Sequence, residues 1–246
     1  MNLPQVLRRP RNLMFMAGVL VILAVVVVPF VYINFIKEDA PPRLKLGDGT
    51  STTTPGPSSS TTTATASGNQ TSGELDGTWK IATGSEVGYR AKEVLFGQDA
   101  EAVGRTSNVE GQFTFIGTTL QTAEFNVDMT TVTSDEDRRD GQFHGRIMDT
   151  KTYPKATFKL TAPVTIEQIP AKGEPFDVEV AGTFTIRGVT KNVTLTLKAL
   201  NSDESIEING LFPVIFSDYA IPDPSFGPAE VQDRGEIEFL LKFSRI

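Results

Sequence analysis

The stretch that decides the fold reads DVEVAGTFTIRGVTKNVTLTLKA and covers residues 177–199. Apolar side chains recur in it at every second position and are separated by polar ones. Successive side chains of a β-strand point to opposite faces, so this period of two predicts two strands that each bury one face. The alternating apolar positions are Val178, Val180, Phe184, Ile186, Val193, Leu195, Leu197 and Ala199.

The same alternation recurs along the chain from residue 75 onward. Gly, Asn and Asp separate the alternating segments, and a helical pattern is visible only near 139–150. About nine half-buried strands with short turns indicate an all-β sandwich or barrel, and one apolar face per strand favours a single sheet curled around that face. The further apolar positions are Trp79, Ile81, Val87, Tyr89, Phe113, Phe115, Ala123, Phe125, Val127, Met129, Ala156, Phe158, Leu160, Ile206, Ile208, Phe212, Ile237, Phe239, Leu241 and Phe243.

The N-terminal part has a different character. Residues 13–36 read LMFMAGVLVILAVVVVPFVYINFI without a charged side chain, and about 20 apolar residues suffice to cross a bilayer core, so a transmembrane helix is predicted. A cleavable signal peptide has a shorter apolar core and a small-residue cleavage site; neither is found here, which favours an uncleaved anchor. Because three arginines lie within residues 1–12, the positive-inside rule places that segment in the cytoplasm and the remaining chain in the periplasm or cell-wall space.

A linker is expected between the span and the folded domain. Residues 47–73 are all Gly, Ser, Thr, Pro or Ala except Asp48, Asn69 and Gln70, a composition that cannot bury a core and is typical of flexible segments. The expected organisation is therefore a cytoplasmic N-terminus, a span, a flexible linker over 37–76 and a β-domain over 77–246.

Composition excludes several classes of function. The chain carries a net charge of −7, and the acidic excess lies in the predicted β-domain, which argues against nucleic-acid binding. The absence of cysteine removes disulfides and thiolate chemistry, and the single histidine, His144, cannot form a two-histidine metal site. We therefore predict no catalytic residues and no metal site, and interpret His144 as a surface or hinge residue.

Four segments give the β-domain a family resemblance: SDEDRRDGQF (134–143), TYPKATF (152–158), GTFTIRGVTKNVTL (182–195) and FSDYAI (216–221). In order and spacing they resemble the YceI-like family, over roughly residues 77–246. The resemblance implies an elongated, eight-stranded antiparallel, lipocalin-like barrel whose apolar interior accommodates a long polyisoprenoid chain. It also implies a secreted or periplasmic setting and, for some members, a link to isoprenoid quinone metabolism.

The chain departs from the family pattern in two places. Members often carry Arg-Asp-x-His-Leu, whereas here Gly141, Gln142 and Phe143 follow Arg139-Asp140 and precede His144. Members also often place an arginine before Ser-Asp-Tyr-Gly; here Phe216 holds that position and Ala220 replaces the glycine. These changes put recognition of a ligand head group in doubt more than recognition of its tail.

The inward-pointing apolar residues form the candidate binding site. An eight-stranded barrel is wide enough either to be filled by its own side chains or to hold one ligand, and small residues such as Ala123, Gly182 and Ala199 are expected to leave room for a narrow chain. No cofactor is predicted apart from such a polyisoprenoid lipid or quinone. The predicted ligand-binding residues are Phe113, Phe115, Phe125, Val127, Phe158, Phe184, Ile186, Leu195, Leu197, Phe212 and Phe239.

Two loops and one rival function remain open at this stage. The charged run 135–140 is interpreted as a solvated loop in which Arg139 and Asp140 form an ion pair. Residues 218–230 contain three prolines, so they form either a lid over the barrel mouth or a rigid connection. The rival to a lipid carrier is a filled barrel that serves as an accessory subunit of an envelope complex, and homodimerisation is left open.

Overall fold

The computed structural model of the protein describes residues 40–47, 75–202 and 205–246. Residues Pro41–Ile246 form one compact unit. The predicted N-terminal segment 1–12, the predicted span 13–36 and most of the predicted linker lie outside the described residues. Within the described ranges, no helix is both long and apolar enough to cross a membrane.

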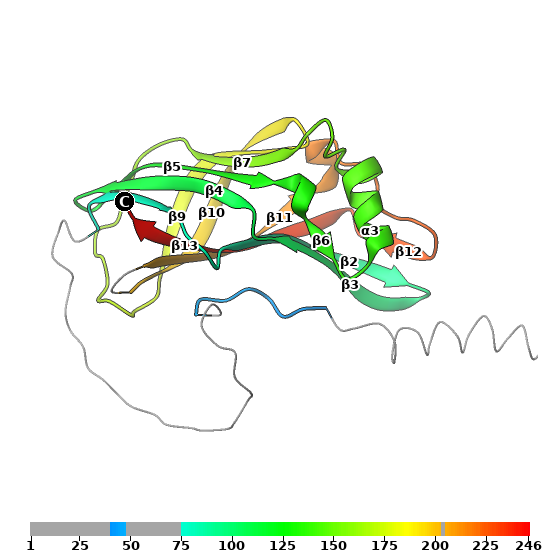
Figure 1. The fold of residues 1–246 in the computed structure, drawn as a ribbon, viewed down its shortest axis with the longest axis horizontal. Coiled ribbons are helices and arrows are strands. Elements are labelled where there is room, and N and C mark those ends of the chain that lie inside the picture. The colour runs from blue at the N-terminus through cyan, green and yellow to red at the C-terminus, as the bar shows by residue number, and fades with distance from the viewer. Residues whose placement is uncertain (1–39, 48–74, 203–204) are drawn as a thin grey trace, which may run out of the picture. The chain divides into compact units, whose positions relative to one another are not determined.

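Thirteen strands form one antiparallel sheet among the described residues (Figure 1). The strands are β1 (Gly77–Ile81), β2 (Glu86–Leu95), β3 (Gln98–Thr106), β4 (Val109–Ile116), β5 (Thr119–Asp128), β6 (Thr133–Ser134), β7 (Lys155–Leu160), β8 (Val164–Thr165), β9 (Phe176–Ile186), β10 (Val189–Asn201), β11 (Ile206–Ile215), β12 (Ala229–Val231) and β13 (Arg234–Arg245). The short helical segments are η4 (Met129–Thr131), α3 (Asp137–Gln142), the π-helical η5 (Phe143–Ile147) and η6 (Phe216–Tyr219).

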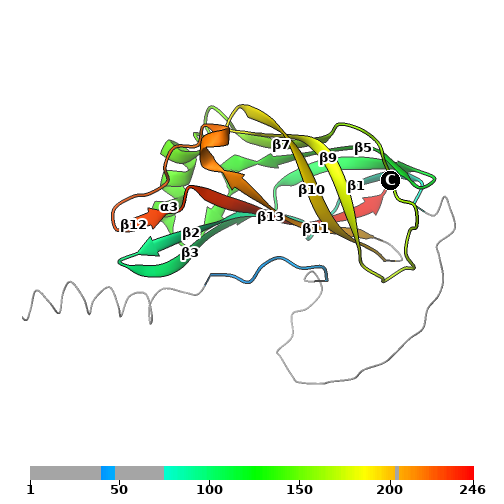
Figure 2. The same cartoon turned by 180° about the vertical axis from the view of Figure 1, so that it is seen from behind.

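Eight of these strands close into a barrel. Their order is β1, β4, β5, β7, β9, β10, β11 and β13, and β13 pairs again with β1. One edge of β13 pairs with β11, and the other edge is shared by two strands. Residues 243–245 pair with β1, while residues 236–240 pair with β2. The sheet continues from β2 through β3 to β6. Figure 2, which views the barrel from behind, shows β9 and β10 in the wall nearest the viewer, and β10 pairs in turn with β11. The prediction of an all-β, eight-stranded antiparallel barrel is confirmed.

The turn between β9 and β10 shows how the sequence sets the strand register. Ile186 pairs directly with Val189, which leaves a two-residue loop of Arg187 and Gly188. Both loop residues have positive φ, 51° and 75°. This geometry matches the twist of the flanking strands and is favourable for glycine, so Gly188 stabilises the hairpin at the centre of the stretch that predicted the fold.

The predicted inward phase is the one observed. On β9, Val180, Phe184 and Ile186 are buried, whereas the intervening Ala181 is exposed and Thr185 is only half-buried. On β13, Phe239, Leu241 and Phe243 of the inner phase are buried, and Leu240 of the outer phase is buried as well. Each strand therefore presents its apolar face to a common interior, as the period of two requires.

The charged run at 135–140 is helical rather than a simple loop. Helix α3 begins at Asp137 and continues into η5, in agreement with the helical pattern near 139–150. The predicted Arg139–Asp140 ion pair is wrong. Arg139 instead forms ion pairs with Asp135 and with Glu93 of β2, because the helix directs adjacent side chains to different sides.

Asp140 has a separate role on the same helix. Its carboxylate accepts hydrogen bonds from the backbone N–H of Ser134, at 2.9 Å, and from the Ser134 hydroxyl, at 2.7 Å. These bonds fix the start of the helical segment to β6. Phe143 then stacks on Tyr89 of β2 with ring centroids 5.0 Å apart, which packs η5 onto the barrel.

Candidate functional site

The inward-facing side chains form two buried clusters, one toward each end of the barrel. We call the cluster that includes Trp79 the first cluster and the one that includes Phe143 the second cluster. The first cluster contains Leu75, Trp79, Phe113, Phe115, Ala123, Ile169, Ile206, Phe239, Leu241 and Phe243. The second contains Met129, Val132, Phe143, Met148, Ala156, Phe184, Ile186, Val214, Tyr219 and Ile221.

Aromatic rings dominate the first cluster. Phe243 is fully buried and meets Phe113 edge to face, with centroids 4.8 Å apart. Trp79 stacks on Phe113 with ring centroids 6.2 Å apart, and its indole Nε1 donates a hydrogen bond to the Leu75 carbonyl at 2.9 Å. The only polar atom of this large side chain is therefore satisfied, which leaves its ring free to seal this end of the interior.

The inward side chains between the two clusters are less buried. Phe212 and Ile237 are half-buried and pack against both clusters. Val193 packs against the second cluster and Leu197 against the first, and both are also half-buried. These four inward-pointing side chains keep accessible apolar surface, which an apolar ligand can cover.

The structure brings all eleven predicted binding residues onto this inner face. Phe113, Phe115 and Phe239 belong to the first cluster, and Phe184 and Ile186 to the second. That any of the eleven contacts a ligand remains a prediction. The other six lie on the same phase, with Phe125, Val127, Leu197 and Phe212 packed against a cluster, Leu195 buried and Phe158 half-buried.

Gly182 does not provide the free space that its small size suggested. A Cβ placed on Gly182 would lie 2.4 Å from the Phe158 ring and 2.7 Å from the backbone oxygen of Lys159. Gly210 is covered in the same way by the Phe239 ring, at 2.3 Å. Both glycines therefore accommodate a phenylalanine of the chain itself. Room for a ligand must come from the half-buried positions.

Two tyrosines outside the predicted binding set lie in the interior near α3: Tyr89, which the alternation placed on the inner face, and Tyr219. Tyr219 is buried in the second cluster, with its ring 5.7 Å from that of Phe184. Burial raises the pKa of the Tyr89 and Tyr219 phenols, and the Asp218 carboxylate adds to the shift at Tyr219. Both phenols are thus neutral near pH 7, which suits an apolar interior.

The comparisons with known proteins agree with this architecture. A family model described as the YceI-like domain matches residues 79–243. The chain belongs to the YceI-like family. A search of curated proteins found no match.

Solved structures share the fold of this YceI-like domain. A polyisoprenoid binding domain from Saccharophagus degradans, described as implicated in plant cell wall breakdown, aligns with a TM-score of 0.55 at 16% identity, over 68% of this chain and 98% of its own. BcnA from Burkholderia cenocepacia aligns with a TM-score of 0.51 at 22% identity, over 66% of this chain and 98% of its own. At these identities the likeness establishes the fold.

Residues 218–230 of the YceI-like domain, which we call the cover, lie beside η5. Tyr219 and Ile221 belong to the second cluster. Arg146 of η5 donates hydrogen bonds to three successive carbonyls of this segment, those of Asp223, Pro224 and Ser225, at 2.5, 3.1 and 3.3 Å. These contacts hold the segment in place, and its role as a lid over the barrel mouth stays a prediction.

An arginine reaches this end of the barrel from the turn between β9 and β10. The family often places one before Ser217, where this chain has Phe216, but Arg187 in the β9–β10 turn donates a hydrogen bond to the Ala220 carbonyl and lies 6.0 Å from the centre of the Tyr153 ring. Ala220 holds φ at 52°, a conformation that suits the glycine expected there. No local sequence pattern predicts this contact, because Arg187 and Ala220 lie on separate segments.

A groove of about 490 Å³ lies at β1, β4 and β5. Charged and polar side chains line it together with Ile81 and Val109, so its lining is less apolar than that of the interior. The groove is lined by Lys80, Ile81, Val109, Glu110, Gly111, Gln112, Glu124 and Asn126. Over the described part of the chain, no group of three or more His, Cys, Asp or Glu residues could hold a metal ion.

Proposed function

We propose that the protein is a membrane-anchored, extracytoplasmic carrier that binds a polyisoprenoid-type lipid inside its barrel without catalysing a reaction. The observation that carries this proposal is the inner face, where half-buried apolar side chains lie between two buried clusters. Each CH₂ group moved from water to such a site contributes about 0.8 kcal/mol. A long prenyl tail can therefore bind tightly with few contacts to its head group.

Family membership supports the ligand class. The domain from Saccharophagus degradans is described as polyisoprenoid binding, and this chain covers 98% of that domain with the same fold. The inner face is built from apolar residues on nearly every barrel strand, and the phenols of Tyr89 and Tyr219 beside it are neutral near pH 7. An uncharged, elongated ligand fits this lining better than a charged one.

The ligand is tested by purifying the full-length protein from its own membrane in mild detergent and extracting it with organic solvent. Mass spectrometry should detect an isoprenoid lipid at about one molecule per chain, as one elongated interior implies. The solvent-exposed variant Lys159→Ala should retain the same amount. A lipid profile equal to that of the bulk membrane would overturn the carrier proposal and favour the filled barrel that acts as an accessory subunit.

The anchor is a separate part of the proposal and rests on residues 13–36 and the arginines before them. Protease added to intact spheroplasts should cut within 48–74 and convert the chain to a shorter fragment that contains the whole barrel. A cytoplasmic protein in the same sample serves as the control for intact membranes. If the chain is cut only after the membrane is broken, the proposed topology is wrong.

A further inference from the structure

Two outward-pointing residues of β13 are buried although they lie on the outside of the barrel. Ile237, Phe239 and Leu241 of this strand face the interior, so Glu238 and Leu240 face outward. Each of these two side chains is only 2% exposed. A carboxylate as buried as that of Glu238 is costly unless it is paired and hydrogen-bonded, and something must cover it.

Two arginines pair with Glu238 from the neighbouring strands. Arg90 of β2 donates from Nε to Glu238 Oε2 at 2.7 Å, and Arg105 of β3 donates from Nε to Glu238 Oε1 at 2.8 Å. Gly88 pairs with both Glu238 and Arg105 and so lies between them. A Cβ on Gly88 would lie 2.7 Å from Arg105 Cγ, so the glycine lets Arg105 cross the strand to reach the carboxylate.

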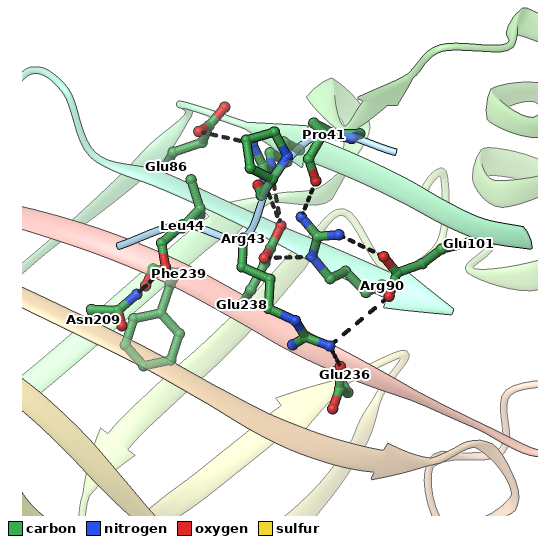
Figure 3. A network of polar contacts seen from close by, with 12 residues as sticks. Pro41, Arg43, Leu44, Glu86, Arg90, Glu101, Asn209, Glu236, Glu238 and Phe239 are labelled. Carbon is green, nitrogen blue, oxygen red and sulfur yellow. Dashed lines mark hydrogen bonds and ion pairs between the residues drawn. The ribbon is translucent and has the colours of Figure 1, made fainter. Parts of the chain in front are cut away.

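The same arginines hold the segment that covers them. Arg90 Nη2 donates to the Pro41 carbonyl and Arg105 Nη2 to the Pro42 carbonyl, each at 2.5 Å (Figure 3). Pro41 precedes a proline and is therefore held extended, which sets the direction of its carbonyl, and the φ angle of both prolines is fixed by their rings. We call residues 41–47 the strap.

The strap also supplies its own cation to the wall. The Arg43 guanidinium lies 2.7 Å from the Glu236 carboxylate and 4.0 Å from that of Glu101. Glu101 in turn accepts a hydrogen bond from Arg90 Nη1 at 2.7 Å. The charges of the strap and of the wall therefore alternate across the contact, as Figure 3 shows.

The second half of the strap continues onto β11. Asn209 Nδ2 donates to the Leu44 carbonyl at 2.9 Å, and the Gly47 backbone N–H donates to Glu207 Oε2 at 2.8 Å. Leu44 and Leu46 are half-buried while the residues around them are exposed. The strap thus binds side chains of β2, β3, β13 and β11 through backbone carbonyls, one backbone N–H and an ion pair.

We infer that the strap is a docking segment for this wall of its own barrel and that it stays bound there in solution. A docked strap keeps Glu238 and Arg90 covered, and the folded part of the chain then begins at residue 41 rather than at residue 77. The inference rests only on the contacts above and not on the proposed anchor.

Disulfide trapping in the full-length protein tests the docking, because the chain has no cysteine of its own. The pair Leu44→Cys with Asn209→Cys places one thiol on the strap and one on β11. A protease site inserted within 48–74 then allows the chain to be cut after mild oxidation. We expect the two fragments to stay joined on a non-reducing gel and to separate when the disulfide is reduced.

The matched control pairs Leu44→Cys with Lys159→Cys, whose partner position is exposed on β7, four strands from β13 in the ring. These fragments should separate after the cut. Equal trapping of the two pairs, or trapping of neither, would overturn the inference. Disulfide-linked dimers in the uncut protein would also overturn it, because they would place the strap on a second copy.

Charge reversal shows whether the ion pair seats the strap. Arg43→Glu, added to the 44/209 pair, should slow disulfide formation severalfold, and adding Glu236→Arg should restore the rate. An unchanged rate with Arg43→Glu would contradict the contact described here. The lipid content of all these variants should match that of the unaltered protein, so loss of docking and loss of lipid binding are distinguishable.

Discussion

The position of a residue in the alternating pattern decides whether its side chain points into the barrel or away from it. Phe184 gives the sharpest test of this rule. It is 6% exposed, with its ring 5.2 Å from Phe212. A carboxylate at this position would have neither water nor a cationic partner, so Phe184→Asp should cost about 3–5 kcal/mol or prevent folding. Chemical unfolding of the full-length protein in detergent measures the loss.

The neighbours of Phe184 are the controls for that experiment. Thr183 and Thr185 point to the outer surface and are half-buried. Thr183→Asp and Thr185→Asp should therefore each change the free energy of unfolding by less than about 1 kcal/mol. Equal losses at 183, 184 and 185 would show that the assigned phase of β9 is wrong.

The alternating sequence pattern predicts which face of a strand each side chain lies on, but it does not predict which side chain covers which neighbour. A period of two reports burial whatever the neighbours are, so the eleven candidate residues could be placed on the inner face without a structure. The filling of Gly182 by Phe158 could not be predicted. Phe158 pairs with Phe184, and Gly182 pairs with Leu160, so the contact is diagonal and depends on a register that the pattern does not give.

At the scale of elements, η5 holds the cover formed by residues 218–230 through one side chain. Arg146→Ala removes the hydrogen bonds to three carbonyls of that segment. Because these bonds are exposed, a loss of about 1 kcal/mol in local stability is expected, or roughly fivefold faster amide exchange there. Hydrogen exchange with mass spectrometry measures the change for peptides that cover 222–228.

Lys155→Ala is the control for the Arg146 variant, since it removes an exposed ion pair with Glu110 on another part of the barrel. It should leave exchange at 222–228 unchanged. Unaltered exchange in Arg146→Ala would mean that the cover is held by Tyr219 and Ile221 alone.

The helical pattern near 139–150 indicated α3 and η5 but not where they begin. Helix α3 has six residues, none of them buried, so its first turn shows no apolar stripe that would mark its start. The strap was not predicted and was assigned to the linker, because it precedes the Gly/Ser/Thr-rich stretch. Its partners lie far along the sequence, with Arg43 and Glu236 193 positions apart, and no local pattern reports such contacts.

For the whole molecule, the number of strands in the ring came from the family resemblance rather than from alternation. Alternation predicted about nine strands and one curled sheet, whereas the structure closes eight strands and shares one edge of β13 between β1 and β2. The open question at this scale was whether the interior is filled or hollow. The half-buried side chains between the two clusters are what favour a ligand.

The measurement that tests the lipid carrier most directly compares two phenylalanine substitutions on β10. Val193 points inward and is half-buried, whereas Thr194 points outward and is exposed. Val193→Phe should fill ligand space at a cost to stability of about 1–3 kcal/mol, and Thr194→Phe should leave the interior unchanged. Both variants are purified as full-length protein from their own membrane, shown to be folded by circular dichroism, and extracted for lipid.

If the lipid binds inside the barrel, Thr194→Phe should carry about one isoprenoid lipid per chain, as the unaltered protein does. Folded Val193→Phe should lose most of that lipid. Leu197→Phe, at the second half-buried position of the same strand, should show the same loss. Equal amounts of isoprenoid lipid in the folded inward and outward variants would contradict binding inside the barrel.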